Sequence, residues 1–220
     1  MKTSPLDYVL STSLFVILLS LSFASVVVLI EPLTNRLLGE YHVVADFLLF
    51  LLAYGLLSGL VVRTLAKAVP LQEGSFPLDD RNFTYWKLYS MVFYTGRALL
   101  IPWTHMAARP LVLKLFGARI GADVAIGGDI DSPYLTTIGA GTAIGNGSHV
   151  VGTMTVNDKI FIGRVRIGSN VTIAMNAVVL PDVEIGDNAV VEIGSVVMPG
   201  TRIPAGERWR GNPARKWMAS

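Results

Sequence analysis

Residues 167–203 read IGSNVT IAMNAV VLPDVE IGDNAV VEIGSV VMPGTR I, and every group of six begins with isoleucine or valine. The same spacing runs upstream from Ile120 to Ile162, and a one-residue slip near Gly163-Arg164 separates the two series. Of the fifteen positions in the two series, fourteen hold a β-branched aliphatic residue and one holds serine: Ile120, Ile126, Ser132, Ile138, Ile144, Val150, Val156, Ile162, Ile167, Ile173, Val179, Ile185, Val191, Val197 and Ile203. Glycine often follows the anchor at once. No helix has a period of six, so the pattern predicts a triangular coil with one short strand per side and glycine-tolerant corners.

Such a coil explains how the repeat is stabilised. Each turn stacks on the next, so that backbone groups pair between turns and the aliphatic anchors form a continuous interior column. Fifteen groups, at three per turn, predict about five turns. We expect this β-helix to occupy residues 119–205, with a C-terminal segment at 206–220.

The apolar excess of the chain lies at its N-terminal end. Hydrophobic residues make up 52% of the 220 residues and charged residues 15%, well below the usual quarter for a soluble domain. Residues 9–30 carry no charge, and residues 43–62 are interrupted only by Asp46. About 20 apolar residues cross a bilayer as a helix, so residues 1–66 are predicted to form a two-helix transmembrane anchor. We expect Asp46 to lie near the headgroups; an intramembrane functional carboxylate is the alternative.

The orientation of the anchor follows from its flanking charges. Lys2 precedes the first helix and Arg63 and Lys67 follow the second, whereas the connecting loop has Arg36 offset by acidic residues. The positive-inside rule therefore predicts an integral membrane protein with both ends, and the β-helix, in the cytoplasm.

Residues 67–118 are predicted to hold a linker and amphipathic interfacial helices. A polar stretch at 64–82 indicates the linker, and aromatic and basic residues mix from Phe83 to Phe116. Pro102 and Pro110 are expected to divide this region into short helices. Such helices suit the membrane–water boundary, and a helical collar packed under the coil is the alternative. The fold class is thus membrane-anchored α+β.

The isoleucine/valine-glycine repeat resembles the hexapeptide-repeat acyltransferase superfamily, whose coils are left-handed. Residues 201–217 resemble the ending of many of these enzymes. The nearest likeness is to the membrane-embedded C-terminal region of peptide-synthetase-like proteins of the poly-lysine synthetase type. Four segments carry it: the approach at residues 127–139, Gly147-Ser148-His149, the loop that follows to Lys159, and Trp209-Arg210-Gly211-Asn212-Pro213.

The resemblance implies that His149 is a general base in acyl transfer, because the pKa of imidazole lies near neutral pH. Asp158 is the candidate that orients the imidazole, with four other acidic residues equally open: Asp129, Asp131, Asp182 and Glu184. A solvent-exposed corner histidine without a role is the alternative for His149. The irregular stretch at 152–159 is read either as a loop over the active site or as a turn defect.

The resemblance also implies an acyl-CoA co-substrate, acetyl-CoA in the first place, bound in the groove between adjacent coils of a homotrimer. The candidate binding residues are Asn212, Pro213, Arg215 and Lys216, where the basic pair meets the nucleotide phosphates. A basic C-terminal helix is the alternative. We expect a hydroxyl or amine acceptor that is lipid-linked or close to the membrane.

Two other classes of function stay open. A metal enzyme of the gamma-carbonic-anhydrase type needs several histidines in the coils, whereas His42 and His105 lie outside them and only His149 lies within. A non-catalytic, membrane-anchored scaffold is the third class. The chain has no cysteine, no phosphate loop and no nucleic-acid signature, and we expect no metal.

Overall fold

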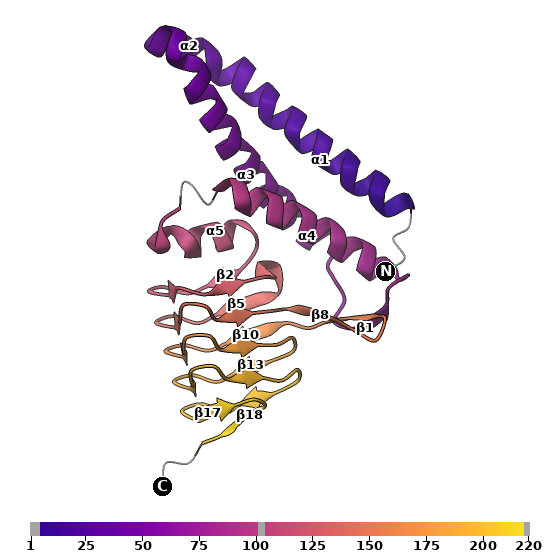
Figure 1. The fold of residues 1–220 in the computed structure, drawn as a ribbon, viewed down its shortest axis with the longest axis vertical. Helices are drawn as coiled ribbons and strands as arrows, with labels where there is room; N and C mark the ends of the chain where they lie inside the picture. Colours follow the sequence, from indigo (N-terminus) through magenta and orange to yellow (C-terminus); the bar gives the residue numbers. More distant parts are fainter. Residues whose placement is uncertain (1–4, 101–103, 218–220) are drawn as a thin grey trace.

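A helical hairpin, a helical collar and a parallel β-helix follow one another along the long axis of the molecule (Figure 1). This computed structural model describes residues 5–100 and 104–217. The helical elements, in order, are α1 (Pro5–Ser25), the π-helix η1 (Val26–Ile30), α2 (Glu31–Leu38), η2 (Gly39–Tyr41), α3 (His42–Ala68), α4 (Arg81–Leu100), η4 (Met106–Ala108), α5 (Arg109–Leu115) and η5 (Pro133–Leu135).

The β-helix has three parallel walls, in which each strand pairs with the strand one turn later. The first wall contains β2 (Arg119–Ile120), β5 (Thr136–Ile138), β10 (Val165–Ile167), β13 (Glu184–Ile185) and β16 (Arg202–Ile203). The second contains β3 (Ala125–Ile126), β6 (Ala143–Ile144), β11 (Thr172–Ile173), β14 (Val190–Val191) and β17 (Arg208–Gly211), closed by the antiparallel β18 (Ala214–Lys216). The third contains β4 (Asp129–Ile130), β7 (His149–Val150), β12 (Val178–Val179) and β15 (Val196–Val197). Five layers in the first wall agree with the predicted five turns.

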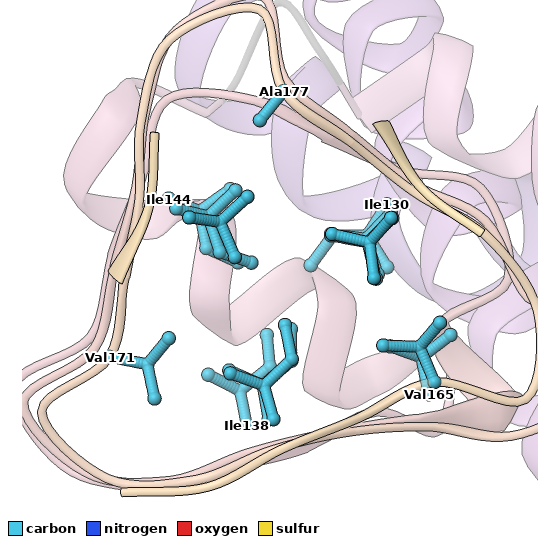
Figure 2. Close-up of a cluster of buried hydrophobic side chains, with 14 of the residues drawn as sticks. Ile130, Ile138, Ile144, Val165, Val171 and Ala177 are labelled. Atoms are coloured by element: carbon cyan, nitrogen blue, oxygen red, sulfur yellow. The ribbon is translucent and has the colours of Figure 1, made fainter. Parts of the chain in front are cut away.

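The interior of the coil is the stack of aliphatic anchors that the repeat predicts. Figure 2 shows labelled members of this stack, among them Ile138, Ile144 and Ile130, pointing inward from the three walls. Ile173, Val179 and the other central anchors are fully buried. β-branched side chains fit a pleated, half-buried surface. Their stacking therefore keeps even strands of two or three residues in register.

Three predicted anchors are wrong. Ile162 is buried, but it packs in the same core cluster as Phe83 and Tyr89 of α4 and not in the interior of the coil. Ser132 is buried, but Ile130 is the residue that faces the interior and pairs with Val150 in the third wall. Val156 is 47% exposed rather than buried. It lies in β8 (Thr153–Val156), which pairs antiparallel with β9 (Lys159–Ile162) as a hairpin outside the coil. The one-residue slip marks the point where the chain returns from this hairpin to the first wall.

The predicted polar linker at 64–82 is also corrected. The helix α3 continues to Ala68, and β1 (Gly74–Pro77) pairs antiparallel with β9. The hairpin and β1 thus form a small sheet that joins the collar to the coil. Ordered pairing replaces the loop or turn defect expected at residues 152–159, because backbone groups of β9 find partners on both edges.

The two apolar stretches of the sequence form the long arms of the hairpin. They fall within one uninterrupted helical run, Asp7–Ala68, which is the single candidate membrane span by length and composition in the described part of the chain. Only 17% of its most apolar window is buried. Within the run the chain reverses through α2, so that α1 and α3 lie side by side (Figure 1). Asp46 lies near this reversal, where its Oδ1 accepts a hydrogen bond of 2.6 Å from Thr34 Oγ1.

In the described part of the collar, the long helix α4 is followed by the short η4 and α5. The helix α4 runs without a break from Arg81 to Leu100, and Pro110 lies in the first turn of α5, where proline is tolerated. Pro102 lies outside the described residues. The buried face of α4, which includes Tyr89 and Phe93, belongs to the same core cluster as Tyr54 of α3. The structure therefore agrees with a collar packed between the hairpin and the coil.

Small residues let α3 approach α4 and α5 closely. A Cβ placed on Gly96 would lie 2.4 Å from the Cβ of Ser58, and one placed on Gly59 would lie 2.2 Å from Leu115 Cγ. Gly55 makes a similar approach to Leu100, at 2.3 Å. Gly55 and Gly59 form the small-xxx-small spacing that brings helix backbones together in lipid.

Gly96→Ala is expected to destabilise this seam by about 1–3 kcal/mol, the usual cost of overpacking. Thermal unfolding of the detergent-solubilised protein, followed by tryptophan fluorescence, measures the change. Ser58→Gly in the same chain removes the closest atom and leaves the end of the Phe116 ring at 3.1 Å. The double variant should therefore regain most of the loss; equal destabilisation of the single and double variants would contradict the seam.

Candidate functional site

His149 lies on the outer face of the third wall. In its two-residue strand, Val150 points into the core, so His149 points outward, and its side chain is 48% exposed. The parallel register places Asp129, His149, Val178 and Val196 in one column, which we name the histidine column. His149 therefore faces outward from a strand of the wall, and not from the corner position predicted from the sequence.

Asp131 is the carboxylate that faces the imidazole. Its Oδ2 lies 4.0 Å from His149 Nδ1, an ion-pair distance that is too long for a direct hydrogen bond. Burial raises the pKa of Asp131, and the charge of Asp129 adds to this; His149 and Arg97 act in the opposite direction. With Nδ1 on the carboxylate side, the Nε2 atom is left for other partners.

The collar helix α4 covers the upper end of the histidine column. Arg97 forms an ion pair with Asp129 and lies 5.9 Å from the centroid of the Phe93 ring. Burial raises the pKa of the Tyr94 hydroxyl, and the carboxylate of Asp131 raises it further. Two polar side chains of the collar therefore meet the acidic and histidine side chains of the coil at one place.

A pocket of about 120 Å³ opens beside this cluster. Polar groups of Arg97, Arg109, Thr104 and Asp129 line it together with Ile126 and Leu113. Arg109 is fixed in place because its Nη1 donates a hydrogen bond of 2.9 Å to the carbonyl oxygen of Gly127. The pocket has room for a small polar group, and most of a larger ligand would have to lie on the open face of the coil.

Arg97 and Tyr94 were not predicted as site residues. Both lie on α4, which ends before the first strand of the coil begins at Arg119. No local spacing in the sequence links them to His149. A pairing across such a sequence distance leaves no periodic signal in a single sequence.

Asp158, the predicted partner of His149, lies in the hairpin turn between β8 and β9. Asn157 and Asp158 have φ values of 49° and 55°, the left-handed conformation of a two-residue hairpin turn. Among the residues that the structure describes, no interaction joins Asp158 to His149. The geometry favours Asp131 as the carboxylate partner.

The predicted CoA-binding residues lie in the C-terminal hairpin of β17 and β18. Lys216 Nζ is 2.6 Å from Glu207 Oε1, and this hydrogen bond, with a second from Trp209, lowers the pKa of Glu207. Arg215 Nη1 donates to the carbonyl oxygen of Ala214 at 3.0 Å. Asn212-Pro213 forms the turn between the strands. The segment is a β-hairpin rather than the basic helix considered as an alternative.

The three histidines do not come together. His42 begins α3, His105 precedes η4, and His149 lies in the third wall. Within residues 5–100 and 104–217, no group of three or more histidine, cysteine, aspartate and glutamate side chains is arranged to hold a metal ion. The described geometry therefore gives no support to a three-histidine zinc site.

One family model matches part of the repeat. Residues 164–198 match the family described as bacterial transferase hexapeptide (six repeats). This part of the coil is therefore similar in sequence to that family's repeat. The comparison with curated proteins gave no match.

Several solved structures are similar to parts of this chain. A hexapeptide-repeat acetyltransferase from Vibrio cholerae O1 biovar eltor, complexed with acetyl coenzyme A, is 25% identical, with 46% of this chain and 60% of that chain covered and a TM-score of 0.43. A maltose O-acetyltransferase from Clostridium difficile 630 is 18% identical over 67% of this chain and 92% of that one, with a TM-score of 0.46. A galactoside acetyltransferase in complex with coenzyme A is 21% identical over 52% and 71%, with a TM-score of 0.43.

Asp131→Asn is expected to stabilise the protein slightly at pH 7, by roughly 0.5 kcal/mol or less because the site is partly solvated. A raised pKa means that the folded state disfavours the ionised carboxylate. The penalty is complete above the folded pKa and vanishes below the unfolded value of about 3.9. Unfolding temperatures of wild type and variant should therefore differ at pH 7 and converge towards pH 3.5. Destabilisation by Asp131→Asn at pH 7 would contradict the prediction.

Proposed function

We propose that the protein is a membrane-bound acyltransferase that moves an acyl group, acetyl in the first place, from acyl-CoA to a hydroxyl or amine. The observation that carries this proposal is an exposed histidine, His149, 4.0 Å from the half-buried carboxylate of Asp131, on a coil that contains a transferase hexapeptide repeat. A histidine in this setting suits a general base, because its neutral form accepts a proton and the neighbouring carboxylate favours the resulting cation.

The proposed step uses His149 as base and then as acid. Nε2 takes the proton from the acceptor O–H or N–H while that oxygen or nitrogen forms a bond to the thioester carbonyl carbon. The tetrahedral intermediate then expels the CoA sulfur as the C–S bond breaks, and the imidazolium returns its proton to the thiolate. Asp131 is a positioning residue that stabilises the imidazolium. In this scheme Asp131→Asn lowers kcat by about 10- to 100-fold while the KM for acyl-CoA stays close to wild type.

The acceptor is proposed to be lipid-linked or close to the membrane. The large exposed side chains Val28, Leu29 and Leu37, at 68–74% exposure, lie on the hairpin end remote from the coil, where lipid contact would remove them from water. The proposal places α1 and α3 across the bilayer with the coil in the cytoplasm. Retention in the membrane pellet after alkaline carbonate extraction is expected; release into the supernatant would contradict the anchor.

We further propose a left-handed coil and a homotrimer, as the likeness to hexapeptide acyltransferases implies. The histidine column continues downward in Val178 and Val196, and the adjoining corner exposes Met175 at 52% and Ile193 at 60%. These apolar side chains suit a contact with a second coil, which would then form the groove for CoA beside His149. Light scattering of the detergent-solubilised protein should give three chains per particle, and a monomer would contradict this part of the proposal.

The experiment that tests the function is calorimetric titration of acetyl-CoA into the purified, detergent-solubilised full chain. Wild type and His149→Ala are both expected to bind, because a base contributes to turnover rather than to affinity. Arg215→Gln and Lys216→Gln test the predicted phosphate contacts of the C-terminal hairpin and should weaken binding. Absence of binding by every form would overturn the acyl-CoA proposal and favour the scaffold.

A further inference from the structure

A cavity separate from the histidine column lies where α3, α5 and the first wall meet. Its volume is about 310 Å³. Four cationic side chains from three elements face it: Arg63 and Lys67 near the end of α3, Lys114 on α5, and Arg119 on β2. Thr137 of β5 adds an exposed hydroxyl group to the lining, whereas the buried Thr136 hydroxyl donates a hydrogen bond of 2.9 Å to the carbonyl oxygen of Ser132. We name these four cations and Thr137 the basic pocket.

The charge in the basic pocket is uncompensated. No aspartate or glutamate lines the cavity, and across the described residues none of Arg63, Lys67, Lys114 and Arg119 forms an ion pair within 4.0 Å. Arg164, a fifth cation at the cavity edge, is held by Glu73 at 2.7 Å. Bringing four positive charges together costs electrostatic free energy that a bound anion would offset.

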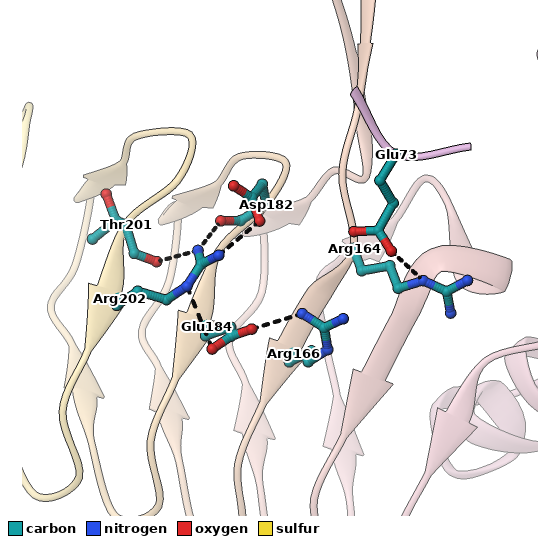
Figure 3. Close-up of polar contacts among 7 residues, drawn as sticks. All are labelled: Glu73, Arg164, Arg166, Asp182, Glu184, Thr201 and Arg202. Carbon is teal, nitrogen blue, oxygen red and sulfur yellow. Dashed lines mark hydrogen bonds and ion pairs between the residues drawn. The ribbon is translucent and has the colours of Figure 1, made fainter. Parts of the chain in front are cut away.

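The rest of the first wall shows how this protein pairs its surface arginines. Figure 3 shows Arg166 and Arg202 both bonded to Glu184, at 2.6 Å and 3.4 Å. Arg119 occupies the same outward column, because the register runs Arg119, Thr137, Arg166, Glu184, Arg202. In the layer next to Arg119 the column has a threonine instead of a carboxylate. The arginine that faces the pocket is therefore the one that the ladder leaves without an acidic neighbour.

Helix termini do not explain the whole cluster. Lys67 and Lys114 lie in the last turns of their helices, where a cation is favoured by the helix dipole. Arg119 lies on a strand of the coil and gains nothing from a dipole, yet it faces the same cavity. Convergence from a helical hairpin, a collar helix and a coil indicates a shared ligand rather than three local effects.

We infer that the basic pocket binds a phosphate group. Lysine and arginine bind phosphate oxygens through charge-assisted hydrogen bonds, and the Thr137 hydroxyl supplies a neutral donor beside them. The inference does not depend on acyl transfer, because none of the pocket residues belongs to the histidine column. Since the pocket lies at the coil end of α3, it would meet the headgroup layer if the hairpin crosses the bilayer, and a phosphate there comes either from a lipid headgroup or from a soluble phosphorylated ligand.

Calorimetry on the full chain in a neutral detergent tests the inference with two probes, short-chain dihexanoyl phosphatidic acid and inorganic phosphate. Saturable binding of one probe or both is expected in wild type. The double variant Lys114→Gln/Arg119→Gln should weaken this binding about tenfold or more, because each of the two cations adds to the electrostatic attraction of the phosphate. Arg166→Gln/Arg202→Gln removes the same formal charge from the same wall and should change the Kd less than about twofold. Arg63→Gln/Lys67→Gln, on a different element, should reproduce the effect of the first pair, which guards against misfolding of a single variant.

The two probes distinguish the source of the phosphate. Binding of phosphatidic acid alone assigns a lipid headgroup, whereas equal binding of inorganic phosphate assigns a soluble ligand; both outcomes support the pocket. Absence of saturable binding by either probe, or an equal loss in the pocket pairs and the Arg166/Arg202 pair, would overturn it.

Discussion

His149→Ala should lower acyl transfer from acetyl-CoA by about 10²- to 10⁴-fold, the usual contribution of a positioned general base. The side chain lies outside the core, with 48% of its surface exposed, so the variant should fold and keep its unfolding temperature within a few degrees. Release of free CoA thiol, measured with a thiol reagent in the presence of an acceptor, follows the reaction directly. Because the chain has no cysteine of its own, the reagent reports CoA alone.

Asp158→Asn is the matched control for this prediction. It alters a carboxylate that was a candidate from the sequence but lies in the hairpin turn, and asparagine adopts the same left-handed conformation. We expect its turnover to stay within about threefold of wild type. A His149→Ala variant with wild-type turnover would remove the proposed base, and a large loss in Asp158→Asn would transfer the role of partner from Asp131 to Asp158.

Ile173→Ala is expected to lower the free energy of unfolding by about 2–5 kcal/mol. The side chain is fully buried in the middle of the second wall, where its register neighbours are Ile144 and Val191. Truncation leaves a cavity that neighbouring turns cannot fill, since their backbones are fixed by pairing on both sides. Thermal unfolding, monitored by circular dichroism in detergent, should show a decrease in Tm of roughly 5–15 °C.

Thr172→Ala provides the comparison at the adjacent position. Thr172 belongs to the same strand but points outward and is exposed, so its truncation should change stability by about 0.5 kcal/mol or less. Similar losses in both variants would contradict the inward and outward alternation from which the coil was deduced.

The repeat was predictable because one physical requirement acts at every turn. An aliphatic anchor must occupy each wall in each layer, and a one-dimensional stack leaves that requirement in the sequence as a fixed period. The hairpin arms were visible for a similar reason, because their length and apolar composition are local properties. Neither signal needs knowledge of contacts between distant segments.

Interruptions of the period were harder to predict. The six-residue spacing predicts Ser132 as an interior residue. The corner after Ile126 is shorter than the others, however, and Ile130 takes the interior position instead. Val156 also matched the count, yet it belongs to a hairpin whose second strand pairs with β1, a segment from the predicted linker. Pairing between segments so far apart in the chain is decided in three dimensions.

Only part of the candidate site could be predicted from the sequence. His149 could be singled out by its residue type and its place in the repeat, whereas the choice among five carboxylates depended on distances. The ion pair between Arg97 and Asp129 joins the collar to the coil, and it appears only when both have folded.

A cryo-electron microscopy structure of the detergent-solubilised protein with bound CoA tests the central claim most directly. The proposal predicts a trimer with CoA in the groove between two coils, its sulfur close to His149 Nε2 and its phosphates near the C-terminal hairpin. CoA bound away from the histidine column would contradict the proposal. So would a sample prepared with a large excess of CoA in which no coil holds CoA.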